Sequence, residues 1–346
     1  MKTVLFGIGC VLVAVTVLSR VPSTQWWIRV MDFPRAQVAV LIALTGIAYA
    51  FTLDDVTLYD LAFGIVLAIG LAYQCARVFP YTPLATRQVR NASHHDRAMS
   101  IRLLVSNVLM ENRRADDFKS LVKEFDPDVV LAVETDDWWD KQLHVLKADY
   151  PNTITQPQGN YYGMHLFSRL ALGSTTVRFL VEDDIPSIRV TITLPSGEDI
   201  EFFGLHPRPP EPKQDTDERD AELLIVGKEV KTCIHPAIVA GDLNDVAWSN
   251  TTRLFQKISG LHDPRQGRGM FSTFHARYPF LRWPLDHVFH DGRFTLVELR
   301  RLRSIGSDHF PVLITLQLDP QVAGKDQTPK AEQKDMQDAN TRISDA

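Results

Sequence analysis

Ser307-Asp308-His309-Phe310-Pro311 precedes the last apolar run of the chain, residues 312–318, and Gly241-Asp242-Leu243-Asn244 ends an earlier apolar run. Side chains two residues apart on an extended segment point to the same side, so Asp242 and Asn244 can face one site. An Asp directly before a His can bind a metal while the His faces a phosphate. Each motif alone is a weak signal, and it is their combination with other polar residues that indicates a site.

Three further polar residues follow apolar runs that are typical of strands. Asn107 follows residues 101–106, Glu134 ends the run 129–133, and His206 comes directly after residues 200–205. A carboxylate at the end of a buried strand suits a hard cation such as Mg²⁺. Taken one at a time, these residues also fit a turn-forming Asn, a first solvated Glu and a loop-capping His.

The Gly-Asp-x-Asn motif is more specific, because each of its residues has a chemical use. Gly241 permits close backbone approach, Asp242 can orient or deprotonate a water, and Asn244 can donate to a phosphoryl oxygen. Its alternative is a simple Asx turn. Asp286 lies in the apolar run 284–289, where a charge needs a partner. An imidazole N–H is the natural partner and would orient a catalytic His, although a structural ion pair fits as well.

Composition separates the chain into two unlike parts. The 346 residues leave room for one large domain or two ordinary ones, and the region before Phe79 is strongly apolar. The net charge of -5 provides no global basic field for nucleic acid. Cys10, Cys75 and Cys233 form neither a disulfide framework nor a zinc spacing, and Cys233 is expected to be a small buried apolar residue.

Three uncharged apolar stretches occupy the first part of the chain, at residues 3–18, 36–53 and 61–76. Each is near the length that crosses a bilayer core, so we predict three transmembrane helices within a membrane anchor of residues 1–79. The first stretch also fits a cleaved signal peptide, and all three also fit buried core helices.

The positive-inside rule predicts the orientation of this anchor. Lys2, Asp54, Asp55 and Asp60 flank one side of the membrane. The side that carries the soluble domain is flanked by Arg20, Arg29, Arg35, Arg77, Arg87 and Arg90. We therefore expect an integral protein of the bacterial inner membrane with its catalytic domain in the cytoplasm. The aromatic and arginine residues in 26–35 predict an anchor at headgroup depth.

The soluble part reads as a linker, a catalytic domain and a tail. Residues 80–100 are polar and predict a linker, residues 101–319 the domain, and residues 320–346 a disordered tail. Apolar runs predict strands at 101–106, 129–133, 165–167, 175–180, 187–194, 200–205, 237–240, 285–289 and 312–318. Helices are predicted at 116–125, 216–234 and 249–258. Many strands with few helices favour an α/β sandwich of two packed sheets.

The order Asn107, Glu134, His206, Gly-Asp-x-Asn, Leu-Asp-His and Ser-Asp-His-x-Pro resembles the endonuclease/exonuclease/phosphatase superfamily, also called deoxyribonuclease-I-like. The resemblance covers residues 101–318, and its Gly-Asp-x-Asn and Ser-Asp-His motifs are specific. The Trp-Trp-Ile-Arg and Asp-Phe-Pro-Arg segments are similar to a bacterial membrane-anchored branch. One departure is Val-Glu-Thr around Glu134, where the family frequently has Gln-Glu.

This resemblance implies a four-layer α/β sandwich and a division of roles. Asn107, Glu134 and Asp308 would lie around Mg²⁺ or Mn²⁺. Asp242 would position the attacking water and Asn244 would hold the phosphate. His309, oriented by Asp286, would contact the scissile phosphate, and His206 would lie on the leaving-group side.

The implied activity is hydrolysis of a phosphodiester or phosphomonoester near a lipid bilayer, with a nucleic acid, a phospholipid headgroup or a nucleotide as substrate. A membrane-associated nuclease is the alternative within enzymes, and a catalytically silent scaffold for a phosphorylated ligand is the alternative outside them. Substrate choice is expected to lie in residues 207–210, in Trp248 and in the arginine- and aromatic-rich segment 265–283. That segment fits single-stranded nucleic acid, lipid headgroups or an ordinary specificity loop.

Overall fold

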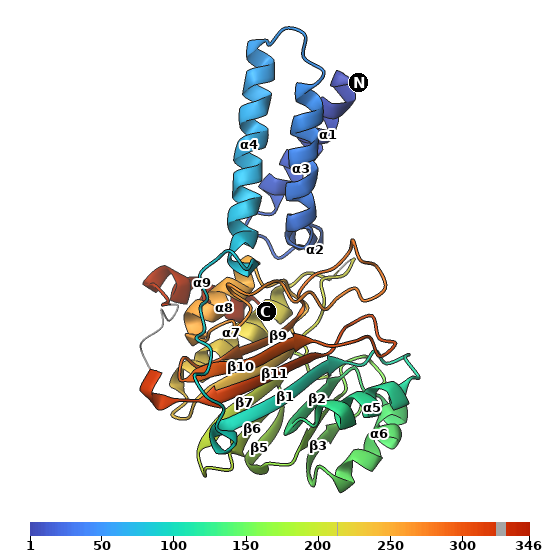
Figure 1. Cartoon of the computed structure of the whole chain (residues 1–346), viewed down its shortest axis with the longest axis vertical. Coiled ribbons are helices and arrows are strands. Elements are labelled where there is room, and N and C mark those ends of the chain that lie inside the picture. The colour runs from blue at the N-terminus through green and yellow to red at the C-terminus, as the bar shows by residue number, and fades with distance from the viewer. Residues whose placement is uncertain (213, 323–329) are drawn as a thin grey trace.

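A computed structural model describes residues 1–212, 214–322 and 330–346 of the chain. Three long helices rise from one end of a layered α/β body, and the first of them begins at the N-terminus (Figure 1). The body has two packed β-sheets with helices on their outer faces, as the sequence predicted.

The first sheet has the strand order β10-β11-β1-β2-β4-β3. Its strands are β1 (Ser100–Asn107), β2 (Val129–Val133), β3 (Asn152–Gln156), β4 (Met164–Ser168), β10 (Phe294–Arg301) and β11 (Val312–Leu318). The second sheet has the order β5-β6-β7-β8-β9. Its strands are β5 (Ala171–Phe179), β6 (Pro186–Thr193), β7 (Asp199–Leu205), β8 (Ala237–Asp242) and β9 (Asp286–His290).

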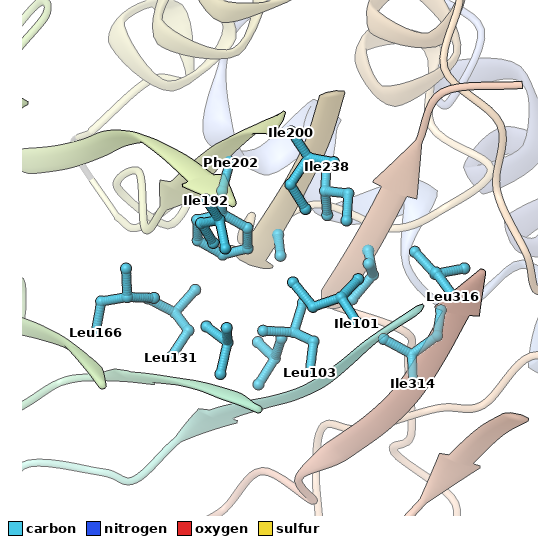
Figure 2. Packing of buried hydrophobic residues seen from close by; sticks show 14 of the residues in the cluster. Ile101, Leu103, Leu131, Leu166, Ile192, Ile200, Phe202, Ile238, Ile314 and Leu316 are labelled. Atoms are coloured by element: carbon cyan, nitrogen blue, oxygen red, sulfur yellow. The ribbon is translucent and has the colours of Figure 1, made fainter. Parts of the chain in front are cut away.

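The space between the sheets is filled by aliphatic side chains. Leu103 and Leu131 of the first sheet face Phe202 and Ile238 of the second, and all four are fully buried (Figure 2). Such residues alternate along each strand, so a one-residue slip in register would turn them away from the opposite sheet. The strand registers, and the polar residues at the strand ends, are therefore held firmly.

Helices complete the outer layers. On the first sheet lie α5 (Ala115–Phe125) and α6 (Asp137–Leu143), which pack Phe118 and Trp139 against the sheet. On the second lie α7 (Asp217–Thr232) and α8 (Asn250–Ser259), which bring Val226 and Phe255 to it. Short 3₁₀ turns cover Val30–Asp32, Phe79–Tyr81, Arg97–Met99, His144–Ala148 and Pro320–Val322.

The prediction of a disordered tail is wrong for residues 333–345. Gln333–Asp345 forms α9, whose buried Ala339 packs against Leu224 of α7 and Leu254 of α8. Lys257 also pairs with Asp335 at 2.9 Å. The helix was missed because its own sequence is polar on most sides, and only packing on α7 and α8 selects its orientation. The rest of the predicted tail includes residues 323–329, which lie outside the described residues.

The predicted linker is also more ordered than its polarity suggests. Val89 is fully buried in the core between the sheets, and Asn91 forms a β-bridge with Leu296 of β10. Tyr81 is buried and donates from its hydroxyl to the Ala247 carbonyl oxygen at 2.7 Å. The segment 80–100 therefore runs along the domain surface as part of it. Cys233, predicted to be buried, is half-buried.

The N-terminal helices are α1 (Lys2–Leu18), α3 (Arg35–Ala50) and α4 (Leu58–Val78), with the short α2 (Trp26–Arg29) between α1 and α3 (Figure 1). By length and composition, one helix, Leu58–Tyr81, can cross a membrane, and the bent pair 26–50 makes a second candidate. Lys2–Leu18 is apolar but shorter. The composition test therefore supports fewer spans than the three that the sequence predicted.

These helices do not resemble the core helices of a soluble protein, which was one alternative for them. They leave large apolar side chains exposed, among them Val11, Leu41, Leu44, Ile65 and Ile69. At the end far from the domain, Lys2 pairs with Asp60 at 2.7 Å. Exposed apolar surface of this extent marks a site of interaction with another protein, a ligand or a membrane.

A buried ionic joint connects these helices to the domain. Asp32 forms ion pairs with Arg29 and Arg35, and all three side chains are buried. The Asp32 carbonyl oxygen accepts from Trp248 Nε1 at 2.8 Å. Trp248 is thus a joint residue and not part of a substrate loop. Arg29 and Arg35 are also buried, and their charges are neutralised by Asp32, so they do not face lipid headgroups. The set of arginines that predicted the orientation therefore loses two members.

Candidate active site

The sheet topology brings the polar strand ends to one edge of the sandwich. β1 and β2 are parallel neighbours, as are β7 and β8, so Asn107, Glu134, His206 and Asp242 all lie at carboxyl ends. β9 runs antiparallel to β8 and places Asp286 directly opposite Asp242. The loop before β11 then brings the Ser-Asp-His motif to the same edge.

Asn107 links the two sheets at the floor of this edge. Its Nδ2 lies 2.6 Å from Glu134 Oε1 and 3.0 Å from Asp242 Oδ2. Its Oδ1 accepts from the Leu109 backbone N–H at 3.0 Å. One amide therefore holds two carboxylates that would otherwise repel each other.

His309 is held between two buried carboxylates. Its Nδ1 lies 2.7 Å from Asp286 Oδ2, and its Nε2 lies 3.4 Å from Asp242 Oδ2. Burial alone would lower the pKa of His309, but the charges of Asp286 and Asp242 outweigh it and raise the pKa to about 10. The imidazole is therefore a cation aimed at Asp242, and it is the partner that the sequence predicted for Asp286.

Ser307 ties this motif to β1. Its hydroxyl donates to the Asn107 carbonyl oxygen at 2.9 Å and accepts from the His309 backbone N–H at 3.0 Å. The Ser of Ser-Asp-His is thus a positioning residue that the sequence did not single out. Thr273 acts similarly, since its hydroxyl accepts from the Asp286 backbone N–H at 3.2 Å.

The pKa values of Glu134, Asp242 and His206 differ because their partners differ. Burial raises the pKa of Glu134 to about 7, although the Asn107 amide opposes the shift. Burial acts to raise the pKa of Asp242 too, but the charge of the nearby His309 and the Asn107 hydrogen bond hold it below its usual value. Burial lowers the pKa of His206 to about 4, so this ring is neutral.

The Gly-Asp-x-Asn turn depends on its glycine. Gly241 has φ +145°, and a Cβ there would lie 1.9 Å from the Leu205 carbonyl oxygen. This is the close backbone approach that the sequence predicted. The turn is closed by the Asn244 backbone N–H, which donates to Asp242 Oδ1 at 3.0 Å. The Asn244 side chain donates to the Pro207 carbonyl oxygen at 2.9 Å.

The polar cluster opens into a cavity of about 680 Å³. Six predicted site residues line it: Glu134, His206, Asp242, Asn244, Asp308 and His309. Asn107 and Asp286 stand behind them through the hydrogen bonds given above. The other walls are mostly apolar and contain Phe274, Leu281, Trp283, Leu285, Tyr161, Tyr162, Pro209, Pro210 and the acidic Glu211, together with Val30, Phe33 and Pro34 from the N-terminal part of the chain. The sequence predicted Phe33 and Pro34 to belong to an interfacial anchor and gave Val30 no role.

The donor set fits a divalent cation. Glu134, His206 and Asp242 each offer an atom, and these atoms lie within 4.8 Å of one another. The His206 nitrogen that faces the two carboxylates is Nε2, which lies 3.9 Å from Glu134 Oε1 and 3.9 Å from Asp242 Oδ2. A cation beside Glu134 would also compensate the burial that raises its pKa, and carboxylate oxygens are the ligands Mg²⁺ prefers. Asp308 lines the same cavity but belongs to neither close group of candidate ligands.

The family to which the chain belongs follows from a match to a known sequence profile. The sequence profile of the Endonuclease/Exonuclease/phosphatase family matches residues 104–309, more than half of the chain. The chain belongs to this family. Its members are metal-dependent phosphoesterases and nucleases, so the chain is a metal-dependent hydrolase of phosphoric esters.

Solved structures of the endonuclease/exonuclease/phosphatase family share the fold. The Danio rerio TDP2 complex with a single-strand DNA product has a TM-score of 0.54 at 17% identity and covers 63% of this chain and 99% of its own. A family protein from Beutenbergia cavernae has a TM-score of 0.53 at 20% identity and covers 64% of this chain and 72% of its own. The human nocturnin catalytic domain has a TM-score of 0.51 at 16% identity, with 68% and 96% covered. No curated protein matches the chain.

Proposed function

We propose that the chain is a membrane-anchored, divalent-metal-dependent phosphoesterase that hydrolyses a phosphodiester or phosphomonoester by in-line attack of water. The observation that carries this proposal is the line Asp286–His309–Asp242, which holds a cationic imidazole beside a buried carboxylate at the polar end of the cavity. The cationic imidazole provides a positive charge for a phosphate beside it, and the carboxylate can orient the attacking water.

The proposed roles follow the geometry. Asp242, with its pKa held low, is ionised and can orient the attacking water. His309, kept cationic by Asp286, contacts the scissile phosphate and offsets the charge that develops on it. Asn244 holds a phosphoryl oxygen, and His206 lies on the leaving-group side.

Glu134 would hold Mg²⁺ or Mn²⁺, with Asp308 on the wall nearby and His206 and Asp242 within reach. Asn107 would join it as a ligand through Oδ1, which in this structure accepts from the Leu109 N–H. When bound, the cation supplies a Lewis acid for a phosphoryl oxygen. Asn107 keeps Glu134 and Asp242 at a fixed separation in either case, because its amide contacts both carboxylates.

We also propose the arrangement of the chain in the cell. Residues 1–79 form the membrane anchor with three helices, residues 101–319 the catalytic domain, and the domain lies on the cytoplasmic side of the inner membrane. The exposed apolar side chains of α1, α3 and α4 support the anchor. A reporter fused to the C-terminus tests the orientation: a signal from the cytoplasm supports it, and a signal from the periplasm contradicts it.

The activity is tested on the full chain in detergent, with Mg²⁺ or Mn²⁺ and a panel of DNA, RNA, nucleotide and lipid phosphoesters. Asp242→Asn and His309→Gln should abolish turnover of whichever ester is cleaved. Asp116→Asn and His235→Gln are matched controls, because both parent residues are exposed and lie outside the cavity. Binding of a phosphorylated ligand without turnover of any ester would favour the silent scaffold instead.

A further inference from the structure

The active-site cavity has two ends of opposite character. Its polar end holds Asp242 and His309, and its apolar walls include Val30 and Phe33 from the segment between α2 and α3 and Leu281 from the loop before β9. A mononucleotide or a free sugar phosphate would leave those apolar walls in water. A phosphate that carries a hydrocarbon chain would cover both ends.

The apolar end lies where the membrane helices meet the domain. Pro34 directly precedes Arg35, the first residue of α3, and Val30 lies five residues before Arg35. Gln37, in the first turn of α3, donates from Nε2 to the Phe280 carbonyl oxygen at 3.0 Å. The loop of residues 276–283 therefore reaches beside the start of α3 (Figure 1).

The tip of this loop exposes large apolar side chains. Phe280 is 85% exposed, Tyr278 56% and Leu281 50%. Trp27 and Val30 of the neighbouring segment are exposed as well. Apolar and aromatic side chains gathered beside the entry point of a transmembrane helix are suited to the boundary between headgroups and acyl chains.

The arginines of this region are not arranged for nucleic acid. Arg265 is buried and forms two hydrogen bonds with Asp263, at 2.8 and 2.9 Å. Arg268 donates to the carbonyl oxygens of Pro264 and Val89, and Arg282 donates to those of His275 and Ala276. Three of the four arginines that suggested a nucleic-acid surface thus hold the loop in shape.

From these observations we infer that the substrate is the phosphoester of a membrane lipid. Its phosphate enters the polar end at Asp242 and His309, and its hydrocarbon chain lies along Val30, Phe33 and Leu281 and continues into the bilayer beside α3. The anchor is therefore part of the binding site as well as a tether. This inference rests on the proposed phosphoesterase function.

Two esters that differ only in chain length test the inference. The full chain in detergent, with Mn²⁺, is assayed on methyl p-nitrophenyl phosphate and on hexadecyl p-nitrophenyl phosphate. We expect the KM for the hexadecyl ester to be lower by about tenfold or more, since each buried methylene favours binding. Leu281→Ser should reduce this KM ratio by about threefold or more, because the exposed half of the Leu281 side chain would lose its apolar contact with the hydrocarbon chain.

Ile234→Ser is the matched control, because Ile234 is 87% exposed and lies outside the cavity. It should leave the KM ratio unchanged. Equal KM values for both esters in the wild-type protein would overturn the lipid inference and leave the phosphoesterase standing. Faster cleavage of a single-stranded oligonucleotide, unaffected by Leu281→Ser, would overturn it as well.

A binding measurement keeps the two proposals separate if neither ester is cleaved. Calorimetric titration with hexadecyl phosphate and with methyl phosphate reports the chain preference without turnover. Tighter binding of hexadecyl phosphate that Leu281→Ser weakens would support the lipid site while the hydrolytic function fails. Equal binding of the two phosphates would contradict the proposed lipid site.

Discussion

His309 Nδ1 lies 2.7 Å from Asp286 Oδ2, and this contact joins the loop before β11 to the first residue of β9 inside the buried floor of the site. The carboxylate keeps the imidazole protonated and fixes the direction of its other nitrogen. Asp286 therefore acts through His309 and is a positioning residue.

Asp286→Asn should lower kcat by about 100-fold or more, with a smaller change in KM, because the amide keeps the shape but loses the charge that steadies the imidazolium. Steady-state kinetics on any ester that the wild-type protein cleaves provide the measurement. Asp116→Asn, at a side chain 95% exposed, is the control. Wild-type kcat in Asp286→Asn would contradict the role.

Glu134→Gln should raise the Mg²⁺ concentration needed for half-maximal activity by at least about tenfold, since it removes a carboxylate from a group of three candidate ligands, Glu134, His206 and Asp242. A chelator should stop the wild-type reaction, and added Mg²⁺ should restore it. The exposed Glu198→Gln is the matched control. An unchanged metal titration in Glu134→Gln would show that the cation binds elsewhere.

Gly241→Ala should destabilise the domain by roughly 3 kcal/mol or more, because the added methyl group would collide with the Leu205 carbonyl oxygen and the backbone has φ +145°. Thermal unfolding of the full chain in detergent measures the loss. Gly159→Ala is the control, since a Cβ there meets nothing within 4 Å. Equal melting temperatures for the two variants would contradict the steric account.

Asp32→Asn should lower the free energy of unfolding by roughly 3–5 kcal/mol, because Arg29 and Arg35 would keep buried charges without their carboxylate. Chemical unfolding followed by tryptophan fluorescence is suitable, since Trp248 donates to the Asp32 backbone. Asp55→Asn, at an exposed position between α3 and α4, should have no effect. An unchanged free energy of unfolding in Asp32→Asn would show that stability does not depend on the ion pairs of Asp32.

Glu222 should make stability depend on pH. Burial, with a contribution from the charge of Glu182, raises the pKa of Glu222 from 4.5 to about 8. Between these values the folded state keeps a proton that the unfolded state has lost, so the free energy of unfolding falls as pH rises from 4.5 to about 8. Glu222→Gln should flatten this slope in thermal melts across that range. The exposed Glu198→Gln should retain it.

The strand ends were predictable because their signals are local. Apolar runs located β1, β2, β7 and β8, and the polar residue after each run fell at the same edge once the strands were paired. β3 and β10 were missed because their burial is partial and they carry many polar residues. Such strands are selected by their neighbours more than by their own composition.

The apolar walls of the cavity were not predictable in the same way. Val30 and Phe33 are more than 200 residues from Asp242 in sequence, and nothing in their local pattern relates them to it. Ser307 and Asn107 are joined by a contact between strands that a linear motif does not contain. These contacts depend on packing between residues that are distant in sequence. Local patterns in a single sequence do not show which distant residue each side chain will contact.

The hydrogen bond from Trp248 to Asp32 has a consequence for biosynthesis, because it joins residues 216 positions apart. The ribosome completes the N-terminal segment long before it makes the residues that pack on that segment. The cavity wall contributed by Val30 and Phe33 therefore stays open until Trp283 and His309 have been synthesised. The site is consequently incomplete on a nascent chain until His309 has been made.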